Sequence, residues 1–271
     1  MASAAPAPRL PMLYDDLRPL SSLEHGDYRL QARNAAPFIT GVHALPVTVD
    51  EFVLLQRSMP IVFSVGEKPV PLALMGLNEG VNVFIDDEGQ LVQPGTYLPA
   101  YVRRYPFMLA KLQQDSQEMS LCFDPTSDAV GDFDEGERLF DGGQPTETTN
   151  QILKFCEQFE TAAIRSQAFV DKLVEYDLLM DGEMTIQPEG SDKPFRYRGF
   201  KMVNEEKLKE LDAEKHSEMA KNGMIALIYA HLFSMSLVRD VFARQMQQGK
   251  MPQPDAQIPE AAEKGGAPAD A

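Results

Sequence analysis

The chain has 271 residues, and 44% of them are hydrophobic, so it is long enough and apolar enough to bury a core. Its 41 acidic and 25 basic residues leave a formal net charge of -16. A field of that sign repels nucleic-acid phosphates and anionic lipid headgroups, so we expect no nucleic-acid partner. The only adjacent basic pair is Arg103 and Arg104.

The two cysteines, Cys122 and Cys156, have neither CxxC spacing nor enough partners for a disulfide framework. We expect them to be buried free thiols in a reducing compartment. The first residues lack a basic region followed by a continuous apolar segment, which predicts that no secretory signal is present. The most apolar stretch, 224–238, contains His231 and two serines and is shorter than a span of about 30 Å requires. These features predict a cytoplasmic protein without membrane insertion.

The amino-terminal part predicts a disordered tail over residues 1–12 and a β-rich half over 13–125. Thr48 and Glu51 have the spacing of a capping box, and they predict a short helix that ends before Pro60. Apolar runs separated by turn residues predict a β-meander of at least three strands. These runs are 61–65, 72–77 and 81–85. A short helix is expected near 107–113, and a further strand at 121–123.

Residues 126–148 predict an acidic connection that contains several glycines. A helix is then expected from Thr146 or Thr149 to about Met180, because apolar side chains recur at alternating spacings of four and three. The apolar stripe is wide, which favours packing on the chain's own sheet over a narrow seam for a partner helix.

The mainly helical half is predicted over 149–247. It includes a strand at 195–203, a charged helix with Asn204 as its N-cap, and a buried helix over 224–246. Residues 248–271 show no apolar periodicity and predict a second disordered tail. We therefore predict an α+β protein, in which an antiparallel β-meander with a short helix is followed by a mainly helical carboxyl-terminal half packed on it.

The common motifs for nucleotide, dinucleotide, zinc-protease and α/β-hydrolase chemistry are absent, so the sequence predicts no cofactor. His25 and Asp27 have the spacing of the first two ligands of a facial triad for non-haem iron, with His216 or His231 as a third. Such a pair arises easily by chance. His231 lies on the predicted buried helix, which is more typical of a hydrogen-bonded core histidine than of a base. With Tyr229, it is the candidate catalytic residue if the protein is an enzyme.

The segment 97–107 interleaves tyrosines, arginines and prolines. Tyrosine and arginine give large contact areas with specific polar ends, which indicates a recognition surface. The candidate binding residues are Tyr101, Arg103, Arg104 and Tyr105. In the alternative interpretation, the arginines pair with the acidic loop and the aromatic rings close the core. Both interpretations are open at this point.

A series of motifs in this order resembles the SapC family from about residue 19 to residue 236. The motifs are Pro46–Val47 with Glu51–Phe52, Pro60–Phe63, Ala73–Leu77, Asn82–Phe84, Tyr97–Phe107, Gly136–Phe140 and Ile228–Leu232. The resemblance implies a link to the bacterial surface layer, from which the family takes its name. It also implies an accessory role beside TonB-dependent outer-membrane uptake systems. The family supplies no catalytic residues to carry over.

We therefore predict a non-catalytic binding or accessory protein of the SapC family with a protein partner. This chain shows no glycine-rich calcium repeats, so it is not expected to be a layer subunit itself. The alternative is an enzyme with an unrecognised pocket, for which non-haem iron is the candidate cofactor.

Overall fold

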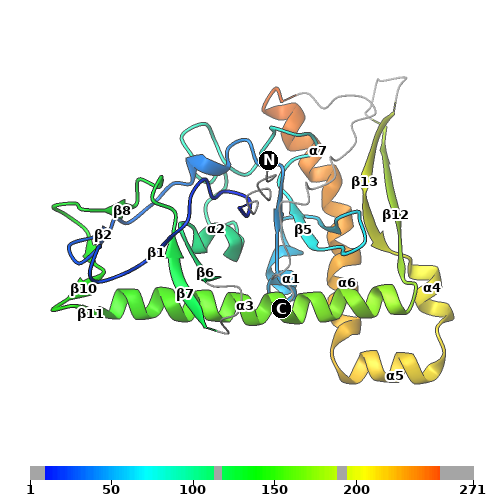
Figure 1. The fold of residues 1–271 in the computed structure, drawn as a ribbon. Coiled ribbons are helices and arrows are strands. Elements are labelled where there is room, and N and C mark those ends of the chain that lie inside the picture. The colour runs from blue at the N-terminus through cyan, green and yellow to red at the C-terminus, as the bar shows by residue number, and fades with distance from the viewer. Residues whose placement is uncertain (1–9, 113–117, 188–193, 251–271) are drawn as a thin grey trace, which may run out of the picture. The chain divides into compact units, whose positions relative to one another are not determined.

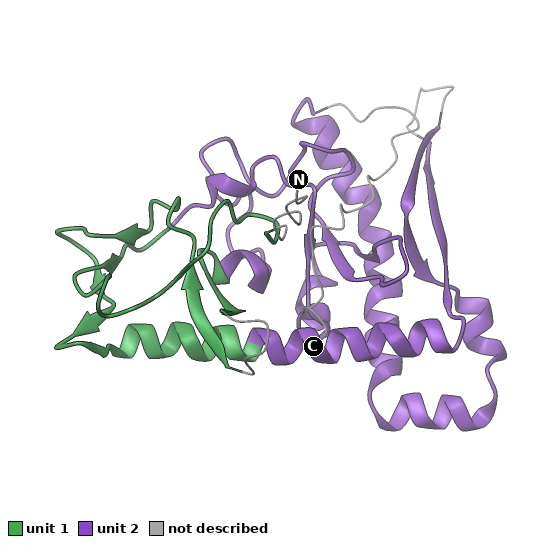
Figure 2. Cartoon of the chain, in the orientation of Figure 1, with its two compact units in different colours: residues 1–33, 104–158, 262–271 green, residues 34–103, 159–261 purple. Residues whose placement is uncertain are grey.

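A computed structural model describes residues 10–112, 118–187 and 194–250. The fold is α+β, with antiparallel sheets in the amino-terminal half and several helices in the carboxyl-terminal half, as predicted (Figure 1). Most of both predicted tails lies outside the described residues. The chain divides into two compact units, each built from segments that are far apart in sequence (Figure 2). Among the described residues, unit 1 contains 10–33 and 104–158, and unit 2 contains 34–103 and 159–250.

Unit 1 is built from short antiparallel strands and the first part of a long helix, α3 (Glu147–Glu175). One sheet has the order β1 (Arg18–Pro19), β7 (Met119–Phe123), β6 (Phe107–Lys111). A second has the order β8 (Val130–Gly131), β2 (Arg29–Leu30), β9 (Glu137–Arg138), and β10 (Phe140–Asp141) pairs with β11 (Gln144–Pro145). The buried core of this unit consists of Phe107, Leu109, Phe123, Val130, Leu139, Phe140 and Cys156.

The helix predicted near 107–113 is wrong, because residues 107–111 form β6. Phe107 and Leu109 are buried on one face of this strand and pair with Phe123 and Leu121 of β7. The segment contains good helix formers, but a period-two burial pattern against a neighbouring strand overrides that local preference. The strand predicted at 121–123 is confirmed as part of β7.

Unit 2 contains a five-stranded antiparallel sheet. Its order is β12 (Leu179–Ile186), β13 (Phe195–Val203), β4 (Ile61–Phe63), β5 (Pro71–Leu74), β3 (Ala44–Pro46). The predicted strands at 61–65, 72–77 and 195–203 are confirmed as β4, β5 and β13. Strand β12 was not predicted, because the long helix was expected to continue to Met180 but ends at Glu175.

The strand predicted over 81–85 is wrong, since this segment forms only an isolated bridge between Ile85 and Leu91. The fully buried side chain of Asn82 explains the difference. Its Oδ1 accepts hydrogen bonds from the backbone N–H groups of Phe84 and Ile85 at 2.9 and 3.2 Å. A side chain that binds the backbone in this way competes with a strand ladder.

Two of the helical segments of unit 2 begin where the sequence predicted caps. The capping box of Thr48 and Glu51 is confirmed, as is the N-cap role of Asn204. The elements that follow these caps are η2 (Val49–Glu51) with α1 (Phe52–Leu55), and α4 (Glu205–Glu210). The remaining helices are η1 (Pro37–Ile39), α2 (Ala100–Arg104), α5 (Ala213–Lys221), α6 (Met224–Ser234), η3 (Met235–Leu237) and α7 (Val238–Gln247). The buried helix predicted over 224–246 is therefore the α6–η3–α7 run.

The part of α3 that belongs to unit 2 packs on the sheet, as predicted. The ring of Phe169 lies 5.9 Å from that of Phe52 and 6.4 Å from that of Phe63 in β4, measured between ring centroids. Ser166 Oγ accepts a hydrogen bond from the backbone N–H of Val49 at 2.9 Å. Helix α6 also packs against β4 and β13, and the ring of its His231 lies 5.0 Å from the same Phe63 ring.

One helical run in the described part of the chain, Met224–Gln247, is long and apolar enough to cross a membrane by length and composition alone. Core helices of soluble proteins pass the same test. In this structure Ile228, His231 and Ser234 of the run are fully buried within unit 2.

Candidate functional site

His231, the candidate catalytic histidine, is fully buried and uses both ring nitrogens to bind backbone groups. Its Nδ1 lies 2.7 Å from the carbonyl oxygen of Ile61, and its Nε2 accepts the N–H of Val203 at 3.1 Å. Because a carbonyl can only accept, the imidazole is neutral with its hydrogen on Nδ1. Burial lowers the pKa of His231 to about 4, although the bond to Ile61 acts in the opposite direction. The side chain joins α6 to β4 and β13.

Tyr229, the other candidate catalytic residue, is not brought together with His231. The two residues are separated by two positions on α6, so their side chains leave the helix in nearly opposite directions. The Tyr229 ring is half-buried and lies 5.7 Å from the ring of Phe233.

His25 and Asp27, the candidate iron ligands, lie in unit 1. His25 is buried, its Nδ1 accepts the N–H of Ser21 at 3.1 Å, and its ring packs on Tyr28 and Phe123 at 4.8 and 5.1 Å. Asp27 is exposed. Among the residues that the structure describes, no three histidine, cysteine or acidic side chains are grouped so that they could hold a metal ion.

The tyrosine and arginine segment divides into buried and exposed parts. Tyr101 is buried and packs against Phe159, with ring centroids 6.2 Å apart. Arg104 is also buried, and in unit 1 its guanidinium lies 6.0 Å from the centre of the Tyr14 ring. The half-buried Tyr105 packs edge-on against the same ring at 5.3 Å. These contacts favour the interpretation in which the aromatic rings close the core.

Arg103 is the exposed member of the segment. Its Nη2 donates to the hydroxyl of Tyr97 at 2.8 Å, and its Nε donates to the carbonyl of Leu98 at 3.0 Å. Its guanidinium also lies 5.2 Å from the centre of the Tyr97 ring. Arg103 therefore holds Tyr97 in place, and Tyr97 lines a pocket described below.

The buried carboxylate of Glu51 fixes the same loop from inside. Its Oε1 accepts the Tyr97 hydroxyl at 3.1 Å and the Ala100 N–H at 2.6 Å. Its Oε2 accepts the N–H and the hydroxyl of Thr48, both at 2.9 Å. Burial, together with the negative charge of Glu51, raises the pKa of Tyr97. One acidic side chain therefore caps a helix and anchors the loop that follows Gly95.

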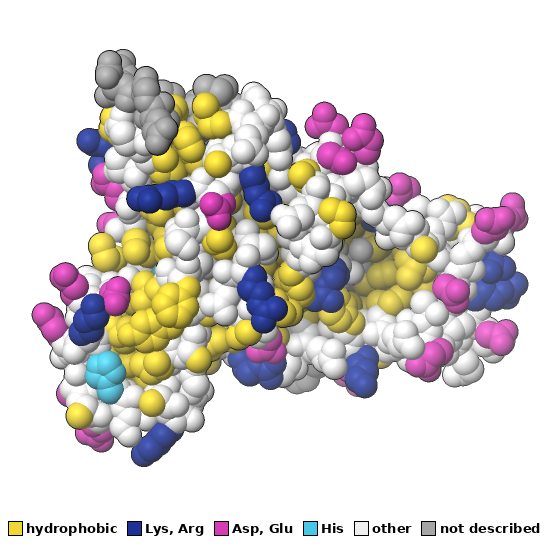
Figure 3. Space-filling model, turned by 180° about the vertical axis from the view of Figure 1, so that it is seen from behind, with side chains coloured by type: hydrophobic (Ala, Val, Ile, Leu, Met, Phe, Trp, Pro, Cys, Tyr) yellow, Lys and Arg dark blue, Asp and Glu magenta, His cyan; other side chains and the backbone are white. Residues whose placement is uncertain are grey.

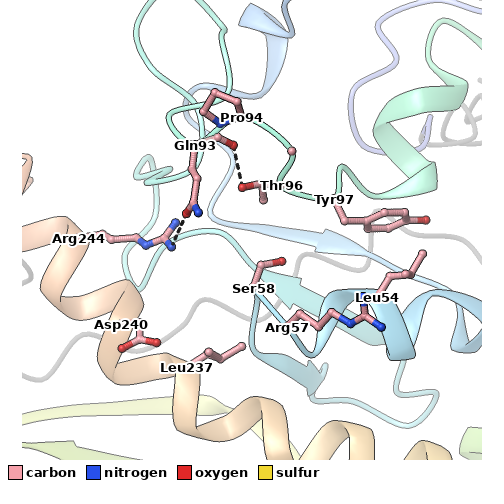
Figure 4. Close-up of a pocket in the computed structure, with 11 residues that line it drawn as sticks. Leu54, Arg57, Ser58, Gln93, Pro94, Thr96, Tyr97, Leu237, Asp240 and Arg244 are labelled. Carbon is pink, nitrogen blue, oxygen red and sulfur yellow. Dashed lines mark hydrogen bonds between the residues drawn. The ribbon is translucent and has the colours of Figure 1, made fainter.

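A pocket of about 480 Å³ in unit 2 is the best candidate for a binding site (Figure 4). Three parts of the unit form it: the end of α1 with the residues after it, the loop 93–97, and the η3–α7 junction. The lining residues are Leu54, Arg57, Ser58, Gln93, Pro94, Gly95, Thr96, Tyr97, Leu237, Asp240 and Arg244. Its volume lies within the range of small-molecule sites.

The walls of the pocket carry two cations and one anion. Arg244 donates from Nη2 to Gln93 Oε1 at 3.3 Å, and its guanidinium lies 4.9 Å from the centre of the Phe84 ring. Arg57 and Asp240 are exposed. In the part of the chain that the structure describes, none of these three charged side chains forms an ion pair. The pocket is thus locally positive on a strongly acidic chain.

The chemistry of this lining suits a ligand that carries an anionic group beside an apolar one. Guanidinium groups form paired hydrogen bonds with carboxylates, and Leu54, Pro94 and Leu237 supply apolar wall. Sequence reasoning identified none of these residues as candidates, because the arginines are far apart in sequence and only the fold brings them to one pocket. The one available signal was Tyr97, which begins the tyrosine and arginine segment.

A sequence model of the SapC family matches residues 20–241 of the chain. Comparison with curated proteins gave no match, and neither did comparison with solved structures.

Proposed function

The chain belongs to the SapC family, and we propose that it is a non-catalytic binding protein that holds an anionic group of its ligand in the unit 2 pocket. The observation that carries this proposal is that Arg57 and Arg244 both line one pocket with apolar walls (Figure 4). Guanidinium side chains form paired, charge-assisted hydrogen bonds with a carboxylate.

The contacts of the candidate catalytic residues support binding over catalysis. A general base needs a free lone pair within reach of a substrate proton. Both nitrogens of His231 are bound to backbone groups, and the His231 side chain is fully buried. His25 packs inside unit 1 on two aromatic rings. These histidines have structural roles that account for their burial.

The proposed setting is the cytoplasm, with a protein partner from a surface-layer or TonB-dependent uptake system. This part of the proposal is supported by the family resemblance and by the acidic composition, which suits a soluble accessory protein. Arg103 contributes to the proposed binding site indirectly, because this exposed side chain positions Tyr97 at the wall of the pocket.

The test uses phenylacetate as a minimal probe that combines a carboxylate with an apolar ring, and phenylacetamide as its neutral counterpart. Binding to the full chain is measured by saturation-transfer difference NMR. We expect phenylacetate to bind weakly, and Arg57→Gln to weaken it about fivefold, since one solvent-exposed ionic contact contributes up to about 1 kcal/mol. Arg239→Gln, which removes an exposed arginine of α7 that does not line the pocket, is the matched control.

Equal binding of phenylacetamide, or an unchanged affinity in both Arg57→Gln and Arg244→Gln, would contradict the proposal. Iron at unit occupancy in the protein purified from its own host would favour the enzyme alternative.

A further inference from the structure

An aromatic strip lies on the exposed side of α6 and leads to the pocket. Phe233 is 65% exposed, and its ring lies 5.7 Å from that of Tyr229, one turn earlier on the helix. Leu237, four residues after Phe233, lines the pocket. We call Tyr229, Phe233 and Leu237 the aromatic strip. Figure 3 shows hydrophobic side chains gathered over this part of unit 2.

The apolar surface extends from the strip onto α1. Helix α1 packs against α6, and its Val53 and Leu54 are 50% and 41% exposed. Leu54 of α1 and Leu237 of η3, which directly follows α6, line the same pocket, so α1 and the α6–η3 run share its apolar wall. Exposed hydrophobic residues scattered singly are ordinary, but a contiguous patch that continues into a pocket is typical of an interaction site.

The basic groups near the strip lie at its pocket end, although the chain as a whole is acidic. At the Tyr229 end, Lys209 of α4 is paired with Glu205 at 3.0 Å. At the other end, Arg57 and Arg244 face the pocket with Asp240 as the only acidic lining residue. Complementary charge therefore favours a partner whose apolar residues are accompanied by an acidic one.

We propose that the aromatic strip docks an amphipathic helical segment of a partner protein, with an acidic side chain of that segment in the pocket. This inference rests on the proposed function of the pocket and names the kind of ligand that supplies the carboxylate. The eight residue steps from Tyr229 to Leu237 span about 12 Å along a helix axis. A partner helix of the same rise presents apolar side chains at i and i+4, and glutamate near i+8, over that distance.

The test uses a fluorescein-labelled helical peptide of about 18 residues with Phe at i and i+4 and Glu at i+8, a length that an isolated helix needs to be stable. Two further peptides replace Glu by Gln, or both Phe by Ala. Affinity for the full chain is measured by fluorescence anisotropy. We expect Phe233→Ala to weaken the Glu peptide at least tenfold and to leave phenylacetate binding unchanged. Val174→Ala, at another half-exposed apolar residue of unit 2, is the matched control.

The outcomes separate this inference from the proposed function. If Phe233→Ala leaves peptide affinity unchanged while Arg57→Gln still weakens phenylacetate, the pocket stands and the docking inference fails. Equal affinity of the Glu and Gln peptides also overturns it. Failure of phenylacetate to bind contradicts the proposed function itself. Phe233-dependent flotation with vesicles of phosphatidylcholine and phosphatidylglycerol would show that the strip binds lipid, and would overturn the protein-docking inference.

Discussion

Acidification should destabilise the protein through His231. The unfolded chain binds a proton at this side chain near pH 6.5, whereas the folded protein binds it only near pH 4, because burial lowers the pKa. The unfolded state therefore holds more protons between these values, and stability falls as pH falls through this window. From about pH 7.5 to about pH 5 the loss attributable to His231 is about 2 kcal/mol.

The comparison that isolates this effect is His231→Gln against the wild-type chain. The variant loses the bonds to Ile61 and Val203 in whole or in part, so it should be less stable by about 2 kcal/mol or more at pH 7.5. At pH 5 the unfolded wild-type chain is protonated at His231, which lowers the free energy of unfolding, whereas the variant has no such group. The stability difference between wild type and variant should therefore shrink by about 2 kcal/mol.

Urea unfolding followed by circular dichroism at 222 nm measures both gaps, since the chain has no tryptophan to report by fluorescence. The control is His216→Gln, which removes a histidine from α5 that is not fully buried. A stability gap between wild type and His231→Gln that stays constant from pH 7.5 to pH 5 would refute the proposed protonation mechanism.

Three further substitutions or modifications test other buried groups. Glu51→Gln should lower the free energy of unfolding by about 2–4 kcal/mol, because an amide cannot accept the four hydrogen bonds that the carboxylate accepts. The control Glu67→Gln, at an exposed residue, should change it little. Asn82→Asp should cost about 2 kcal/mol or more, since it removes the donor to the carbonyls of Ile39 and Val42; thermal unfolding measures it. Burial raises the pKa of the Cys122 thiol to about 11, so little of the reactive thiolate is present at pH 8. Labelling by 5,5′-dithiobis(2-nitrobenzoate) at pH 8 should therefore be at least about a hundredfold slower in the folded protein than in urea. Equal rates would contradict this prediction.

Local signals predicted the parts of the fold that local contacts determine. The capping box works through residues three apart, and Asn204 caps α4 by accepting from Glu206 and Lys207. Strand β13 was visible because its residues alternate, and its length is matched by its partner β12. Each of these patterns is complete within about ten residues of sequence.

Strand β12 was missed because Gly182 has a tertiary role. After a helical pattern, Asp181 and Gly182 resemble a helix stop, which is how the sequence was interpreted. In the structure Gly182 lies inside the β12 and β13 pairing, opposite Phe200. A Cβ at this position would lie 2.1 Å from the Phe200 ring, so the glycine makes room for that ring. The preference for glycine here depends on a residue of another strand and has no local signature.

The burial of the tyrosine and arginine segment also depends on tertiary contacts that the sequence does not reveal. Its residue types indicate a recognition surface, and they equally suit buried rings with hydrogen-bonded arginines. Only the three-dimensional contacts assign Tyr101 and Arg104 to the interior and Arg103 to the surface. Composition selects residues with large contact areas, but it does not say whether the contact is with the chain itself or with a partner.

In the proposed function, the residues of the α6–η3–α7 run that stabilise the fold and those that bind the ligand lie on different sides of the helices. On its buried side, His231 and Ser234 bind the backbone of Ile61, and Gln245 Oε1 accepts the N–H of Leu77 at 2.7 Å. These polar anchors are directional, so they fix the rotation of the helices more narrowly than apolar packing would.

That rotation decides what the other side presents. With Gln245 fixed, its neighbour Arg244 must face Gln93 and the pocket, and with His231 and Ser234 fixed, Phe233 must face solvent. Substitutions at the anchors should therefore lower stability and binding together, while Phe233→Ala and Arg57→Gln should alter binding alone. A thermal shift for these two surface variants as large as that of His231→Gln would show that the two sides are not separable.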